Sequence, residues 1–131
     1  MLIKKATAIF LGLVYISFAG LQYNDPDPAV WMTIYGLAAI LCFLVAAGKI
    51  TPAALWLAAA MYAAGGAFMW PDQFQGVSIG GGNIKNIEEA REAFGLFMCA
   101  LTFAGFALLH KYEIRRTLRI QQLQKAKWAN L

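Results

Sequence analysis

Charged residues are scarce in this 131-residue sequence, where only 14% of the residues are Asp, Glu, Lys or Arg. Hydrophobic residues make up 60% of the chain, and its mean hydropathy is +0.56. A soluble domain of this size could not bury so much apolar surface, because small domains bury a smaller share of their chain than large ones. The composition therefore predicts one membrane domain, and it indicates no nucleic-acid partner despite the net charge of +4.

Histidine and cysteine are also rare, with one histidine and two cysteines in the chain. Cys42 and Cys99 both lie inside apolar runs, and we interpret them as small core residues without a disulfide. His110 falls at the opposite end of the expected bundle from most carboxylates, which excludes the usual zinc sites and a Ser–His–Asp triad there. The glycine run 80–82 lacks the Lys and Ser/Thr of a phosphate-binding loop.

Four long apolar runs cover most of the chain, at about residues 3–21, 29–47, 53–70 and 87–109. A membrane-spanning helix needs about 20 mostly apolar residues, with a lower limit near 17. The runs predict an all-α fold, a four-helix transmembrane bundle, followed by a basic helical tail at residues 110–131. The first run has the outline of a signal peptide, but we expect it to be retained as a span.

The charges sort onto the two ends of this predicted bundle. One end carries nine of the eleven basic residues, Lys4, Lys5, Lys49, Lys111, Arg115, Arg116, Arg119, Lys125 and Lys127, and the other carries six of the seven acidic residues, Asp25, Asp27, Asp72, Glu88, Glu89 and Glu92. The positive-inside rule then places both termini in the cytoplasm. We expect the protein to lie in the plasma membrane or the inner membrane. The tail is expected to contact membrane lipids, because anionic headgroups attract Lys and Arg.

The first acidic loop is short, polar and rich in proline. Asp27 followed by Pro28 matches the N-cap and N1 positions of the second helix, so Asp27 has a structural explanation. Asp25 has a weaker one, since an Asp-Pro turn could use its carboxylate. Asn24 adds an amide to the same loop.

The fourth run opens with a second group of charges. At 100° per residue, Glu88, Glu92 and Gly95 share a narrow arc, and Arg91 lies at its edge. The helix dipole explains acids in the first turn, but it explains charges deeper in the helix less well. An ion pair of Arg91 with Glu88 or Asp25 would lower the cost of burying these charges. A purely structural network of this kind is the alternative to a ligand site.

Together these segments predict an oxygen-lined pocket at the non-cytoplasmic end. Its expected ligand-binding residues are Asn24, Asp25, Asp27, Glu88, Arg91 and Glu92, and its expected walls are Gln22, Trp31, Tyr35 and Gly95. Asp25, Glu88 and Glu92 could hold a hard divalent cation such as Ca²⁺, although the spacing matches no established metal motif. The same oxygens suit an amine or a phospholipid headgroup, with Arg91 on the phosphate. The alternative for Trp31 and Tyr35 is anchoring at the membrane boundary.

These residues also carry a resemblance to a known family. The stretch Gln22-Tyr23-Asn24-Asp25-Pro26-Asp27-Pro28, followed by Trp31, Ile34 and Tyr35, resembles the signature of the transmembrane protein 220 family. Residues 86–92 with Phe94-Gly95-Leu96 resemble that family's second block. The resemblance covers residues 3–109 and leaves the tail outside. It implies a small multi-span membrane protein, and it indicates no biochemical reaction.

Three functions remain open from the sequence. The first is a binding or accessory protein with an acidic outer pocket for a divalent cation or a headgroup. The second is an intramembrane enzyme that uses paired carboxylates on a lipid or small substrate, with its catalytic residues unknown. The third is a structural or assembly subunit without a ligand, in a homo-oligomer or with a membrane-protein partner. The apolar runs hold no Asp, Glu, His, Lys or Arg near their middle, which argues against a monomeric ion transporter.

Overall fold

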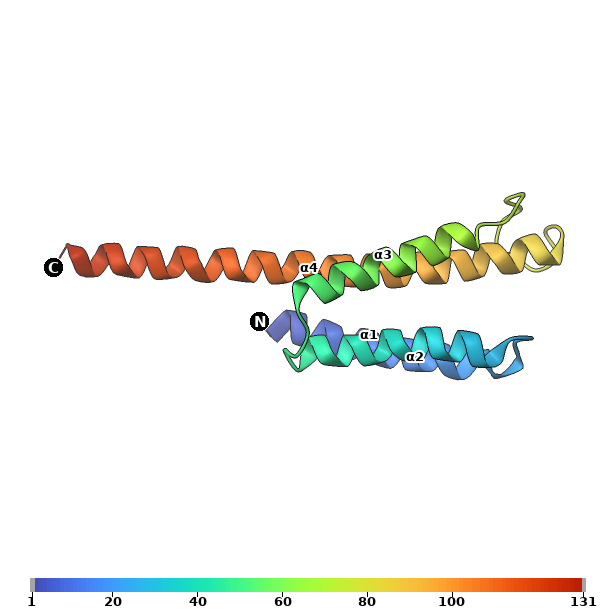
Figure 1. The fold of residues 1–131 in the computed structure, drawn as a ribbon, viewed down its shortest axis with the longest axis horizontal. Coiled ribbons are helices and arrows are strands. Elements are labelled where there is room, and N and C mark those ends of the chain that lie inside the picture. The colour runs from blue at the N-terminus through green and yellow to red at the C-terminus, as the bar shows by residue number, and fades with distance from the viewer. Residues whose placement is uncertain (1, 131) are drawn as a thin grey trace. The chain divides into compact units, whose positions relative to one another are not determined.

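The computed structural model describes residues 2–130, and this part of the chain is helical and contains no strand (Figure 1). Its elements are α1 (Leu2–Leu21), the short 3-10 helix η1 (Gln22–Asn24), α2 (Pro28–Ala46), α3 (Pro52–Phe68) and α4 (Ile84–Ala129). The helices α1, α2 and α4 are long and apolar enough to cross a membrane, whereas α3 is shorter, with 17 residues. The predicted all-α class and the number of helices are confirmed.

The chain divides into two compact units, each of which we describe separately. Unit 1 contains residues 2–51 and 109–130, and unit 2 contains residues 52–108. In unit 1, α1 and α2 form an antiparallel pair joined by η1. Gly12 lies so close to the ring of Phe43 that a Cβ atom there would come within 2.7 Å of the ring. Towards η1, the rings of Tyr15 and Tyr35 stack with their centroids 6.4 Å apart. A glycine contact and an aromatic contact thus hold this pair together along its length.

An ion pair joins the start of α1 to the far part of α4 within unit 1. Lys4 Nζ donates a hydrogen bond of 2.8 Å to Glu113 Oε2, and the two side chains are only 15% and 19% exposed. Burial acts to raise the pKa of Glu113, but the hydrogen bond and the charge of Lys4 outweigh it and hold this pKa below its usual value of 4.5. Glu113 is the one acidic residue that the sequence placed at the basic end, and it is neutralised by a cation from the other terminus.

In unit 2, α3 and α4 run antiparallel in close contact. A Cβ atom at Gly66 would come within 2.7 Å of the Phe97 ring, and the rings of Tyr62 and Phe103 lie 5.6 Å apart. At the end of α3, the ring of Trp70 meets that of Phe94 edge to face at 5.7 Å. Helices in lipid associate by such close packing, because no water is expelled when they meet. The small residues of α3 therefore bring α4 close.

The largest differences from the predicted spans occur at the ends of the last two helices. Helix α3 ends at Phe68, two residues earlier than expected, and α4 begins at Ile84, three residues earlier than expected. Asn83 explains the earlier start, because its Oδ1 accepts the Lys85 N–H at 3.0 Å and so caps the helix. At its other end α4 continues through the tail to Ala129, as expected from a sequence that has no Gly or Pro after Gly105.

Candidate functional site

The first acidic loop has a defined conformation that is set by Asp25. Its Oδ1 accepts the Asp27 N–H at 3.0 Å, and its own N–H donates to the Gln22 carbonyl at 3.0 Å. Asp27 occupies the N-cap position before Pro28, as predicted, but its side chain makes no capping hydrogen bond. Asp25 thus takes the turn role expected of it, whereas Asp27 lacks the expected capping bond. The carboxylate of Asp25 holds the turn, while that of Asp27 is exposed beside the equally exposed Asn24.

The charges at the start of α4 lie on its more exposed side. Glu88 and Arg91 are exposed, and Glu92 and Gly95 are partly exposed. Because α4 begins at Ile84, its first turn contains no acidic residue, and Glu88 and Glu89 lie in the second turn, where the helix dipole acts more weakly. The remaining acid of this stretch, Glu89, lies 3.8 Å from the Lys85 ammonium.

The expected ion pair between Arg91 and Glu88 is not formed among residues 2–130. The alternative partner of Arg91, Asp25, belongs to unit 1, whereas Arg91 belongs to unit 2. That pairing, and the meeting of the first loop with the start of α4, stay predictions. In the same part of the chain, no group of three or more His, Cys, Asp or Glu side chains could hold a metal ion. A headgroup ligand does not require such a cluster.

The predicted wall residues differ in their surroundings. Trp31 and Tyr35 are each only 6% exposed, and their ring centroids lie 6.3 Å apart. Tyr23, by contrast, is 69% exposed and has the exposure expected of a boundary anchor. The Gln22 amide donates to the Phe18 carbonyl at 3.2 Å, which extends the end of α1. The two buried rings thus form part of the aromatic core of unit 1, beside the first acidic loop.

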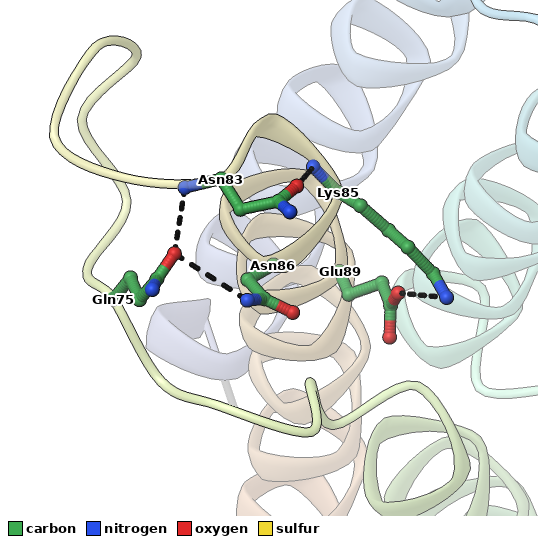
Figure 2. Close-up of polar contacts among 5 residues, drawn as sticks. All are labelled: Gln75, Asn83, Lys85, Asn86 and Glu89. Carbon is green, nitrogen blue, oxygen red and sulfur yellow. Dashed lines mark hydrogen bonds and ion pairs between the residues drawn. The ribbon is translucent and has the colours of Figure 1, made fainter.

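Sequence reasoning missed the polar contacts that close the loop between α3 and α4 (Figure 2). Gln75 Oε1 accepts the Asn83 N–H at 2.6 Å and lies 3.4 Å from Asn86 Nδ2, so one side chain ties the loop to the start of α4. Gly82 is needed beside it, because a Cβ atom there would lie 2.5 Å from Gln75 Oε1. An asparagine just before an apolar helix is a recognisable capping signal, whereas nothing in the sequence spacing singles out Gln75.

Comparison with known proteins gives one match. A family model described as "Transmembrane family 220, helix" matches residues 14–108, which are most of the chain and include the first acidic loop and the start of α4. No curated protein and no solved structure matches the chain.

Proposed function

We propose, from the premise that this chain belongs to transmembrane family 220, that it is a four-span binding or accessory protein whose non-cytoplasmic end holds a polar lipid headgroup. Family membership, together with three helices long and apolar enough to cross a bilayer, makes it an integral membrane protein. The number of crossings, the orientation and the ligand are the parts that we infer.

The ion pair between Lys4 and Glu113 supports four crossings. Lys4 lies at the start of the first predicted span and Glu113 lies after the last one, and their 2.8 Å contact favours placing both on one side of the membrane. The intervening chain would then cross an even number of times, which supports a crossing by α3 in addition to the three longer helices. Its 17 residues extend about 26 Å, close to the bilayer core of about 30 Å. Hydrogen bonds from the Met69 and Trp70 N–H groups lengthen its last turn.

The charges within each unit support cytoplasmic termini. In unit 1, Lys4 and Lys49 lie at one end of the α1–α2 pair, and Asp25 and Asp27 lie at the other. In unit 2, four acids and two cations lie at the end where α3 finishes and α4 begins, namely Asp72, Glu88, Glu89, Glu92, Lys85 and Arg91. Because basic residues are retained in the cytoplasm, the end with the lysines faces inward. The acidic loop and the start of α4 then face outward.

The exposure of Glu88 and Arg91 is the observation that carries the ligand proposal. In a purely structural network, Glu88 and Arg91 would form an ion pair, yet no ion pair joins them among the described residues. An anion and a cation on adjacent turns match the ammonium and the phosphate of a zwitterionic headgroup.

Thermal unfolding in detergent tests this proposal. A ligand that binds only the folded state raises the unfolding midpoint. We expect soluble glycerophosphoethanolamine to raise the midpoint of the full chain, and Glu88→Gln to abolish the rise. The matched control is Glu89→Gln, because Glu89 contacts Lys85 and should leave the rise intact. The headgroup proposal is wrong if the compound has no effect, or if both variants respond alike.

The cation alternative is tested in the same assay with Ca²⁺, Mg²⁺ and Mn²⁺. A rise with one of these ions that Glu88→Gln removes would identify a metal site in place of a headgroup site. The enzyme alternative has little support, because His110 lies 18 residues after Glu92 on the same helix, about 27 Å along its axis.

A further inference from the structure

The far part of α4 is a basic helix that the rest of the described chain leaves uncovered. Residues 114–130 are all exposed. The tail segment 111–130 contains one acidic residue, Glu113, and six cations, Lys111, Arg115, Arg116, Arg119, Lys125 and Lys127. Glu113 pairs with Lys4, and none of the six cations takes part in an ion pair within residues 2–130. The segment therefore presents a net positive surface without an internal counter-charge.

Three of these cations form a row on one side of the helix. Lys111, Arg115 and Arg119 follow each other at four-residue intervals, so their side chains lie above one another. Like charges at this spacing repel and destabilise an isolated helix. Glu113 lies about 160° away around the helix at 100° per residue, and its contact with Lys4 fixes that opposite side towards α1. The row consequently points away from α1.

The helix geometry decides which cations can reach the membrane surface. No Gly or Pro interrupts α4 after Gly105, so the tail continues as a rod from the predicted span. At 1.5 Å per residue, Lys111 to Arg119 lie about 3–15 Å beyond Leu109, whereas Lys125 and Lys127 lie about 24–27 Å beyond it. The headgroup layer is about 5–8 Å thick, and charges act over about 8 Å beyond it at physiological salt.

We propose that Lys111, Arg115, Arg116 and Arg119 bind anionic lipid headgroups at the membrane surface from which the tail emerges. Charge complementarity selects the partner, because four clustered cations within reach of the surface face a leaflet that carries anionic lipid. Lys125 and Lys127 lie beyond that reach and take no part. The proposal rests on the crossing of the membrane by α4 and on the proposed cytoplasmic side of the tail, but it is independent of the ligand site at the opposite end.

The test compares phosphatidylglycerol with phosphatidylcholine around the full chain in reconstituted bilayers, with spin-labelled lipids to measure the preference. We expect the chain to prefer phosphatidylglycerol. Each cation in full contact with an anionic headgroup contributes roughly a fivefold preference. Arg115→Gln/Arg119→Gln should lose much of that preference, and added salt should weaken it. Lys125→Gln/Lys127→Gln, which removes the same charge, should retain it. Circular dichroism confirms that both variants remain helical.

Two results would overturn the proposal. If both double variants lose the preference equally, the effect arises from total charge and has no localised site. If the unaltered chain shows no preference, the basic residues of the tail act only in setting orientation or contact an acidic protein.

Discussion

Replacing Gly66 by alanine tests the packing of α3 against α4. A Cβ atom at this position would lie 2.7, 2.8 and 3.0 Å from three atoms of the Phe97 ring, which are closer than atoms in ordinary contact. A shift of this ring would disturb its contact with Trp70, whose ring centroid lies 6.4 Å away. Overpacking of this kind costs about 1–3 kcal/mol, and alanine recovers about 0.5–1 kcal/mol through its higher helix propensity. We expect a net loss of roughly 0–2.5 kcal/mol of unfolding free energy.

The neighbouring residue provides the matched control. A Cβ atom at Gly65 would lie 3.4 Å from the nearest atom of Leu96, which is an ordinary contact. Gly65→Ala should therefore be neutral or stabilising by up to about 1 kcal/mol, and it should be the more stable of the two variants. Reversible unfolding of the two variants in mixed micelles with increasing SDS measures both. If Gly66→Ala proves as stable as Gly65→Ala, the proposed close approach of the two helices is wrong.

Three further predictions concern polar contacts. Lys4→Met should cost about 1–3 kcal/mol at neutral pH, because it removes a charged hydrogen-bond donor from the carboxylate of Glu113. The pKa of Glu113 is held below 4.5, so this cost should fall on acidification below pH 4.5 as the carboxylate protonates, and a cost independent of pH contradicts this. Asp25→Ala should lower the unfolding free energy by about 1 kcal/mol and Asp27→Ala by much less, because only the former accepts a backbone N–H. Gln75→Ala should speed hydrogen exchange at the start of α4 without changing the rest of the helix, and unchanged exchange there would contradict the role of its side chain in closing the loop.

The fold could be predicted from the sequence because hydrophobic length is a strong signal. Four apolar runs predicted four helices, and the predicted helical tail forms the last part of α4. No Gly or Pro after Gly105 interrupts that helix. The boundaries were less certain where a polar first turn precedes the apolar run. The earlier start of α4 was missed because its first turn contains the polar residues Lys85 and Asn86. Asn83, which precedes them, is a residue type that commonly caps helices.

The candidate site was less predictable, because side-chain partners depend on local geometry. Both Asp25 and Asp27 could have capped the loop, and only the structure assigns the hydrogen bond to Asp25. The partner of Glu113 could have been inferred from the sequence, since this acid is isolated among cations at the end of the chain that also holds Lys4. Gln75 could not, because its contacts span an irregular loop without a repeating pattern.

Labelling of single cysteines in intact cells tests the proposed orientation most directly. Asn24→Cys and Arg91→Cys, each in a chain whose buried Cys42 and Cys99 are changed to alanine, should react with a membrane-impermeant thiol reagent added from outside. Lys49→Cys provides the matched control, because it lies at the basic end of the α1–α2 pair and should react only after the membrane is permeabilised. If Lys49→Cys reacts in intact cells, or if the other two variants react only after permeabilisation, the acidic segments do not face outward.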